Sequence, residues 1–265
     1  MSFRQQTVWI TGATSGIGEH LAYTFAREGA NLVLLGRNMA ALERVQQMCL
    51  THTNNVMIQV LDISDYEKVA AVLQTILTQT DNAVDILINN AGISQRALAA
   101  QTQLSVDKQL MDTNYLGTIA VTKAVLPVFL QKRKGHIVTI TSVVGKIGTP
   151  MRSSYAASKH ALHGFFDSLR AELPETIAVT LICPGFVQTN VSINALTGDG
   201  TPQQIMDNAT ANGLTPDKFC QSALRAIAAR KPEVAIAGIK ERFGILAGRF
   251  YPQLLRRLLR RIAVT

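Results

Sequence analysis

The alternation of short apolar runs with longer segments of helical period most constrains how this chain can fold. Most of the apolar runs lack a polar alternation, as is typical of strands covered on both faces. We predict strands at Val8–Ile10, Asn31–Leu35, Val56–Leu61, Ile86–Ile88, Gly135–Thr141, Ala178–Cys183 and Val234–Ala237. The helical segments include Glu19–Glu28, Met39–Cys49, Glu67–Thr78 and Asn114–Lys132. Strand–helix alternation of this kind predicts an α/β fold, a single Rossmann-like domain with a doubly wound parallel sheet of about seven strands and helices on both faces.

The chain carries no linker rich in Pro, Gly or Ser and no internal repeat, so we predict one domain over residues 1–265. Within it we expect a cofactor-binding and catalytic core at 1–189, a substrate lid at 190–216 and a basic amphipathic extension at 240–265. Open parallel sheets bind ligands beyond the carboxyl ends of their strands. Residues that directly follow a strand are therefore the first candidates for a functional site.

A glycine-rich turn follows the first predicted strand, and a helix follows the turn. Its spacing is G-x-x-x-G-x-G, from Gly12 through Gly16 to Gly18. Glycines permit a tight turn and let the backbone approach a pyrophosphate, while a helix N-terminus offers free N–H groups to an anion. A glycine cluster alone is weak evidence, but its place on the first strand favours a dinucleotide site. The residues that we assign to it are Gly12, Thr14, Ser15, Gly16, Ile17 and Gly18.

The end of the second strand bears on the choice between NADP and NAD. An acidic residue there would accept hydrogen bonds from the ribose hydroxyls of NAD, whereas Arg37 offers a guanidinium that suits the 2′-phosphate of NADP. Asn38 follows directly and joins the predicted contacts. Ser15, where such enzymes often carry a second basic residue, is neutral. We therefore favour NADP and keep NAD as an alternative.

The third and fourth strands end in further candidates for cofactor contacts. Asp62 is placed to accept a hydrogen bond from the adenine amino group, and Ile63 follows it. A helix N-cap is the competing interpretation of Asp62. After the fourth strand come Asn90, Ala91 and Gly92, whose small side chains let a nicotinamide ribose lie against the backbone.

A Tyr–Lys pair one helical turn apart is the strongest catalytic candidate. Tyr155 and Lys159 stand at i and i+4 and so share one face of a helix. A free tyrosine titrates near pH ~10, and a neighbouring ammonium favours the phenolate. Ser142, at the end of the fifth strand, is placed to hydrogen-bond a substrate oxygen. The pair alone is also typical of a helix surface.

The combination of these features resembles the short-chain dehydrogenase/reductase (SDR) family over roughly Thr7 to Thr189. In chain order the resemblance rests on Thr11–Gly18, Asp62, Asn89–Gly92, Asn114, Ser142, Tyr155, Lys159 and Pro184-Gly185. It implies that Tyr155 is the general acid/base, that Ser142 orients the carbonyl or hydroxyl, and that Lys159 lowers the pKa of the tyrosine and binds the ribose. It further implies that Asn114 holds a water that relays protons through Lys159. The nicotinamide carboxamide would then lie against Pro184, Gly185, Val187 and Thr189.

This resemblance implies hydride transfer between NAD(P) and a carbonyl or secondary alcohol. Apolar residues near the expected cleft, Phe186, Val143, Val144 and Ile147, favour a hydrophobic, lipid- or steroid-like substrate, although core packing explains them equally well. A 3-oxoacyl-(acyl-carrier-protein) reductase is the alternative, and the run Lys132-Arg133-Lys134 is its candidate landing surface. A nucleotide-sensing scaffold would usually lack the tyrosine or the lysine. The resemblance also implies a homodimer or homotetramer.

The positive charge of the chain is concentrated at its end. The net charge is +8, but residues 1–216 hold 15 basic and 15 acidic side chains, whereas 217–265 hold 11 and 3. The charge therefore reports a basic tail and does not predict nucleic-acid binding. One helical face of the tail carries Leu254, Leu255, Leu258, Leu259 and Ile262, with four arginines opposite. Such a helix at residues 244–262 either contacts an anionic membrane, as in membrane-associated SDR members that it resembles, or packs on protein.

The cysteines and the hydropathy pattern bear on location. Three cysteines form no C-x-x-C pair, which favours reduced thiols and a cytoplasmic protein. No apolar run reaches the ~20 residues that a membrane-spanning helix needs. We expect a cytoplasmic enzyme, with contact to the inner membrane face as the open alternative, and no metal site.

Overall fold

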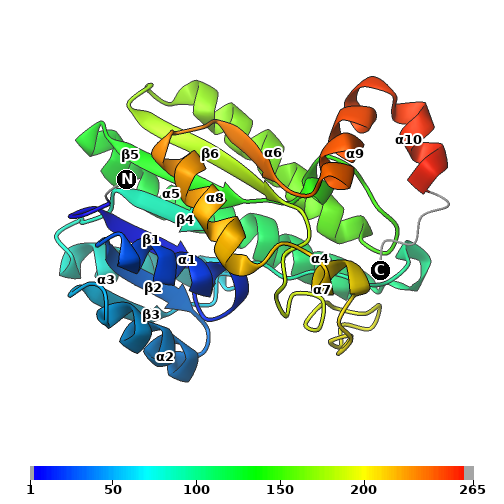
Figure 1. The fold of residues 1–265 in the computed structure, drawn as a ribbon. Helices are drawn as coiled ribbons and strands as arrows, with labels where there is room; N and C mark the ends of the chain where they lie inside the picture. Colours follow the sequence, from blue (N-terminus) through cyan, green and yellow to red (C-terminus); the bar gives the residue numbers. More distant parts are fainter. Residues whose placement is uncertain (1–2, 260–265) are drawn as a thin grey trace.

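The computed structural model describes residues 3–259 and centres on a seven-stranded sheet in the order β3-β2-β1-β4-β5-β6-β7 (Figure 1). Every pair of neighbouring strands is parallel. The strands are β1 (Thr7–Thr11), β2 (Asn31–Gly36), β3 (Val56–Val60), β4 (Ile86–Asn89), β5 (Gly135–Ile140), β6 (Ile177–Pro184) and β7 (Glu233–Ile236). The predicted doubly wound sheet is confirmed, and each predicted strand end lies within one residue of the observed one.

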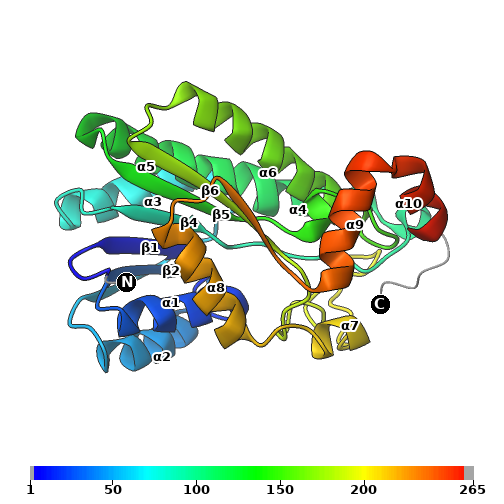
Figure 2. The same cartoon turned by 45° about the horizontal axis from the view of Figure 1, so that its top comes forward.

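Helices cover both faces of the sheet (Figures 1 and 2). One face carries α1 (Gly16–Arg27), α2 (Met39–Leu50) and α8 (Pro216–Ala228). The other carries α3 (Tyr66–Gln79), α5 (Thr118–Lys132) and α6 (Ser153–Glu172), while α4 (Leu104–Met111) precedes α5 and packs against α6 in a smaller cluster. Because successive side chains of a strand point to opposite faces, Val8 and Ile10 pack under α1, whereas Trp9 packs under the other layer.

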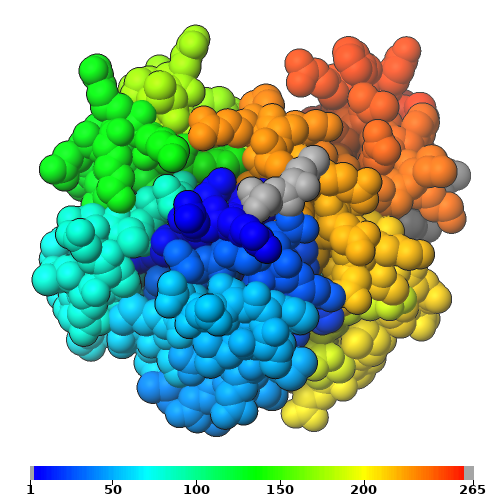
Figure 3. Space-filling model, turned by 60° about the vertical axis from the view of Figure 1, so that its left-hand side comes forward, coloured from blue at the N-terminus to red at the C-terminus, as the bar shows by residue number. Residues whose placement is uncertain are grey.

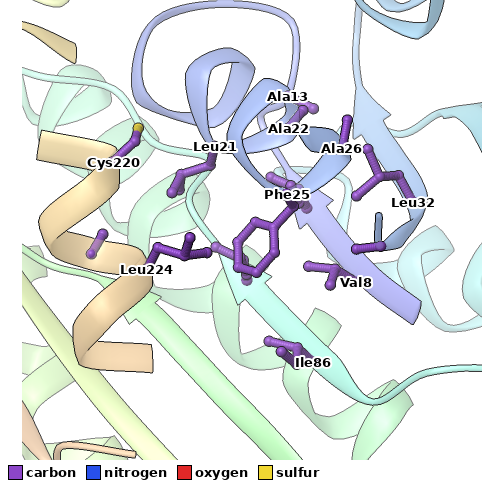
Figure 4. Close-up of a cluster of buried hydrophobic side chains, with 14 of the residues drawn as sticks. Val8, Ala13, Leu21, Ala22, Phe25, Ala26, Leu32, Ile86, Cys220 and Leu224 are labelled. Atoms are coloured by element: carbon purple, nitrogen blue, oxygen red, sulfur yellow. The ribbon is translucent and has the colours of Figure 1, made fainter. Parts of the chain in front are cut away.

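The core beneath α1 shows how the first strand–helix unit is held. Phe25 points from α1 into the space between Val8, Ile86 and Leu224 (Figure 4). These side chains are almost completely buried, so α1 and α8 pack on the sheet through this cluster. The start of α1 is thereby held at the end of β1.

Leu104–Lys132 forms one continuous helical stretch that is long and apolar enough to cross a membrane by length and composition alone. Half of its most apolar window is buried. Val121, Val125 and Phe129 are fully buried against the sheet. We therefore assign this stretch to the core of the domain.

Strand order reverses at β1, which has β2 on one side and β4 on the other. Beyond the carboxyl ends of the strands lie α7 (Asn208–Ala211), α9 (Ile239–Phe250) and α10 (Pro252–Leu259) in both ribbon views (Figures 1 and 2). Figure 3 views the molecule from the side of the amino ends of the strands. In this view the orange-to-red atoms of the C-terminal part stand at the upper right. Two hollows of about 580 and 310 Å³ open at these amino ends, at the end of the sheet opposite the glycine turn.

The three cysteines, Cys49, Cys183 and Cys220, are free and buried, as predicted. Burial raises the pKa of each thiol, to about 11 or 12. They therefore behave as small apolar core residues at neutral pH. Arg260, Arg261 and Ile262, which belong to the predicted tail helix, lie outside the described residues.

Candidate active site

The turn after β1 has the geometry of a phosphate-binding loop. Gly12 and Gly16 have φ angles of +66° and +58°, which side chains rarely adopt. A Cβ at Gly12 would lie 2.8 Å from the Cα of Ala91, and one at Gly18 would overlap the carbonyl oxygen of Gly12. Ser15 precedes α1 without a side-chain hydrogen bond to the helix, so the first N–H groups of α1 are left for an anion. These residues fit a pyrophosphate.

Thr14 and Ile17 have structural contacts within this turn. The methyl group of Thr14 fills the space beside Gly36, and Ile17 packs against the core under α1. Their predicted cofactor contacts would therefore come from backbone groups. These two assignments stay predictions.

Polar bonds tie the glycine turn to the end of β4. The Oγ1 of Thr11 accepts the N–H groups of Asn90 at 3.0 Å and Ala91 at 3.1 Å. In return, the side-chain amide of Asn90 donates to the carbonyl oxygens of Thr11 and Gly12 at 3.0 and 3.1 Å. The amide of Asn90, which we predicted beside the ribose, thus holds the turn in place.

Arg37 and Asp62, which we predicted to contact the adenosine part of the cofactor, lie close together. Arg37 is largely exposed, with its Nη1 3.9 Å from the Oδ2 of Asp62. The Oδ1 of Asp62 accepts the N–H and the hydroxyl of Ser64 at 2.9 and 2.7 Å, which leaves Oδ2 toward the guanidinium. The Oδ1 of Asn38 accepts the N–H of Ala41 at 3.0 Å, so this side chain caps α2. Ile63 is buried.

Helix α6 presents Tyr155 and Lys159 on one face, as predicted. The Nζ of Lys159 lies 5.9 Å from the centre of the Tyr155 ring. Ser142 follows β5, caps the short 3₁₀ turn Val143–Gly145, and hydrogen-bonds Tyr155. The structure therefore brings together three of the four predicted catalytic side chains, Ser142, Tyr155 and Lys159.

Burial controls the titration of this group. It raises the pKa of Tyr155, while the hydrogen bond from Ser142 and the charges of Arg152 and Arg96 lower it. Burial lowers the pKa of Lys159 to about 8, and its Nζ donates to the carbonyl oxygen of Ile140 at 3.0 Å. Two arginines that we did not predict thus contribute to the acidity of the phenol.

These two arginines belong to a buried ion cluster that reaches into the predicted lid. The Nε and Nη2 of Arg96 donate to the Oδ2 of Asp207 at 2.7 and 2.6 Å, and Arg152 lies 3.6 Å from the same oxygen. All three side chains are at least 96% buried. The guanidinium of Arg152 also lies 5.6 Å from the centre of the Phe186 ring. Because Asp207 and Arg96 are 111 residues apart, no local motif announces this cluster.

Gln95 is a second residue that sequence reasoning missed. It is completely buried, and its Oε1 accepts the N–H groups of Ser154 at 3.0 Å and Tyr155 at 3.3 Å. The residue before α6, Arg152, gives the helix no side-chain cap. Gln95 therefore caps the catalytic helix from a distant segment and fixes the start of α6 beside the reacting tyrosine.

Asn114 lies in a π-helical turn, Asp112–Gly117, between α4 and α5. Its buried side chain accepts the N–H of Ile93 at 2.8 Å and donates to the Ile93 carbonyl oxygen and the Ser158 hydroxyl, both at 3.0 Å. A Cβ at Gly92 would lie 3.0 Å from the Asn114 Oδ1 and 3.5 Å from the Lys159 Nζ. Asn114 thus stands next to Lys159, and the water relay stays a prediction.

The segment after β6 runs back to the glycine turn. The N–H of Gly185 donates to the carbonyl oxygen of Ile236 at 3.0 Å, and Val187 pairs with Leu214. Thr189 packs 3.5 Å from where a Cβ of Gly16 would lie. Thr189 therefore lies against the glycine turn, and the predicted nicotinamide contacts of Pro184, Gly185, Val187 and Thr189 stay predictions.

One group of side chains in residues 3–259 has a metal-ligand composition, namely His163, Cys183 and Glu233. The imidazole stands between its neighbours, with Nδ1 3.4 Å from the Glu233 carboxylate and Nε2 3.8 Å from the Cys183 sulfur. Lys146 holds the same carboxylate at 2.6 Å. Within residues 3–259 the His163 Nδ1 has this ion-pair contact but no hydrogen-bond partner, and we assign no metal to the group.

Comparison with known proteins identifies the family of the chain. A family model described as short chain dehydrogenase matches residues 6–199. "Dehydrogenase/reductase SDR family member 7B" of Xenopus tropicalis is 47% identical over 239 residues, which cover 88% of this chain and 77% of the frog protein. The Bos taurus protein of that name is 43% identical over 263 residues, or 97% of this chain and 81% of its own length.

Two solved structures show the same fold. A short-chain dehydrogenase from Sphingobium yanoikuyae in complex with NADPH has a TM-score of 0.77 and 28% identity, covering 94% of this chain and 95% of its own. A short-chain dehydrogenase/reductase from Burkholderia phymatum in complex with NAD has a TM-score of 0.81 and 24% identity, covering 97% and 96%. The chain belongs to the short-chain dehydrogenase family and is an oxidoreductase of that family.

Replacing Gln95 tests its role as a positioning residue. Gln95→Leu removes the acceptor for two N–H groups at the start of α6, so we expect kcat to fall at least about tenfold, because two buried N–H groups lose their partner. KM for the cofactor should change little, because the glycine turn is untouched. Gln95→Glu keeps the acceptor oxygens and should restore most of kcat. Equal losses of kcat in both variants, with unchanged folding by circular dichroism, would contradict the positioning role.

Proposed function

We propose that this protein reduces the carbonyl group of a hydrophobic substrate with NADPH. The observation that carries the proposal is the group of Ser142, Tyr155 and Lys159 beside a glycine turn whose N–H groups are left for an anion. When bound, the nicotinamide supplies a hydride to the carbonyl carbon. Ser142 and Tyr155 would hold the carbonyl oxygen, and Tyr155 would give it a proton as charge develops there.

Lys159 would act on the cofactor side of the same reaction. Its ammonium would hold the ribose hydroxyls and so set the position of the nicotinamide. With a pKa of about 8, the amine stays mostly protonated at neutral pH. The resemblance to the family further assigns Lys159 and Asn114 to the path by which Tyr155 regains its proton. The position of both side chains beside Gly92 supports that assignment.

The preference for NADP rests on Arg37, which is exposed at the end of β2. A guanidinium there suits a 2′-phosphate. The Sphingobium relative supports the proposal because it is in complex with NADPH. The Burkholderia protein, in complex with NAD, keeps NAD as the alternative cofactor.

Lipid- or steroid-like substrates fit the apolar residues around the predicted cleft. Val143 and Val144 follow Ser142 directly, and Phe186 follows the Pro184-Gly185 turn. The basic run Lys132-Arg133-Lys134 gives no support to an acyl-carrier substrate, because it precedes β5 at the amino ends of the strands. The Nζ of Lys132 there donates to the carbonyl oxygen of Asn82 at 2.6 Å.

The segment 190–216 would serve as the substrate lid. It is anchored by the Asp207–Arg96 ion pair and by a backbone bond from Arg96 to Leu196 of 2.8 Å. Opening would therefore break a buried ion pair. For assembly and location we propose a cytoplasmic homodimer or homotetramer that contacts the inner membrane face through its C-terminal extension.

Replacing Tyr155 tests the proposed chemistry. Tyr155→Phe keeps the ring and removes the proton donor, so reduction of a panel of ketones with NADPH should fall about 10²–10⁴-fold in kcat. Tyr66→Phe alters a partly exposed tyrosine on α3 and should leave the rate unchanged. The measurement is NADPH oxidation at saturating ketone. Undiminished activity in Tyr155→Phe would exclude the mechanism.

Replacing Arg37 tests the cofactor preference separately. Arg37→Ala should lower kcat/KM for NADPH about 10–100-fold, the size of a lost charged hydrogen bond, and should change kcat/KM for NADH less than about twofold. Arg133→Ala, an arginine at the amino ends of the strands, is the matched control. A wild-type preference for NADH would refute the NADP assignment.

A further inference from the structure

Helix α9 carries an apolar stripe that faces away from the domain. Ile239, Phe243, Leu246 and Phe250 follow one another at i, i+4, i+7 and i+11, which places them on one face of the helix. Their exposed fractions are 88, 65, 56 and 65%. Four large apolar residues in one exposed row differ from the scattered apolar residues of an ordinary surface.

The opposite side of α9 packs on the protein, which sets the direction of the stripe. Gly244 and Gly248 lie against Ile147, and Gly248 also meets Leu255 of α10. Ala247, on the same side, is buried. Small residues at these positions let α9 approach the turn after Ser142 closely. The stripe is thus held outward by packing on the other face.

Helix α10 carries further exposed apolar residues. Tyr251, Leu254 and Leu258 are exposed, whereas Leu255 turns inward onto Gly248. The predicted apolar face of this helix is therefore divided between packing and exposure. We call the exposed set the outer apolar face, and it consists of Ile239, Phe243, Leu246, Phe250, Tyr251, Leu254 and Leu258.

Cationic side chains surround the outer apolar face. Over residues 239–259 the exposed basic residues are Lys240, Arg242, Arg249, Arg256 and Arg257. The sole acidic residue in that range is Glu241, and its carboxylate points toward Gly185 and Gly238. Apolar residues flanked by arginines complement a bilayer with anionic headgroups, because the rings enter the acyl boundary while the cations stay at the headgroups.

We propose that the outer apolar face docks on the surface of an anionic lipid bilayer. A second copy of the chain fits this face less well, because a symmetric contact would bring two sets of five cations together. An acidic protein would match the arginines but would leave seven large apolar side chains in water. The bilayer satisfies both features of the surface.

Docking would bring the start of α9, which lies beside Gly185, close to the lipid. The Oε1 of Glu241, in the first turn of α9, lies 3.2 Å from where a Cβ of Gly185 would stand. The face thus begins beside the predicted nicotinamide end. Resting on the proposed function, this geometry favours a ketone that is itself a membrane lipid, whereas the docking stands without any catalysis.

Vesicle flotation of the full-length protein tests the docking. The vesicles contain phosphatidylcholine with or without phosphatidylglycerol, at about 0.01 M and about 1 M ionic strength. We expect flotation with the anionic vesicles at low salt and at least tenfold weaker binding at high salt. Phe243→Ser/Phe250→Ser should bind at least tenfold more weakly. Met48→Ser/Leu130→Ser, which removes exposed apolar residues of α2 and α5, should bind as the wild type does.

Three outcomes would overturn the docking. The first is no flotation with anionic vesicles. The second is equal flotation of Phe243→Ser/Phe250→Ser and wild type. The third concerns the oligomeric state. If the wild type does not bind vesicles and is a dimer in sedimentation equilibrium, and Phe243→Ser/Phe250→Ser is a monomer, the face is a subunit interface. Activity on a small water-soluble ketone, measured in the same preparations, should be equal in wild type and variant. If no preparation shows activity but flotation holds, the proposed function fails while the docking stands.

Discussion

The burial of charged side chains beside Tyr155 is the constraint on which the site depends. Lys159, Arg96, Arg152 and Asp207 are all buried, with exposed fractions of 5, 6, 3 and 5%. Desolvation disfavours every charged form, so the phenol of Tyr155 becomes less acidic and the amine of Lys159 less basic. The opposing influences on Tyr155 are the hydrogen bond from Ser142 and two guanidiniums. The predicted lowering of the Tyr155 pKa thus comes from Ser142, Arg152 and Arg96, whereas Lys159 is not among the groups that shift it.

Three sets of hydrogen bonds connect the glycine turn, the end of β4 and the start of α6, which carries Tyr155. Thr11 and Asn90 join the glycine turn to the end of β4. Asn114 joins Ile93, in the loop after β4, to Ser158 of α6. Gln95 caps α6 from the same loop. Since buried N–H and carbonyl groups must find partners, these side chains both satisfy the backbone and fix the distance from the glycine turn to Tyr155.

The strands, the glycine turn and the shared face of Tyr155 and Lys159 could be predicted because each depends on residues close together in the sequence. Gln95, Arg96 and Asp207 could not, because their partners lie 59 to 111 residues away and no spacing links them. Asn38 and Asn90 show a second limit. A polar residue after a strand suits a ligand and a backbone bond equally well, and here both side chains bond the backbone. The pattern of the tail predicted an amphipathic helix, but only packing shows that Leu255 turns inward while Leu254 stays exposed.

The desolvation of the site can be measured directly by NMR titration of the protein labelled with 13C at lysine Cε, with Lys159 assigned by the signal lost in Lys159→Arg. A lysine whose charged form is disfavoured by burial loses its proton at lower pH than the ordinary value of about 10.4. The account predicts that Lys159 titrates with a pKa of about 8. A pKa for Lys159 at the ordinary value would show that water reaches the amine and would contradict the account.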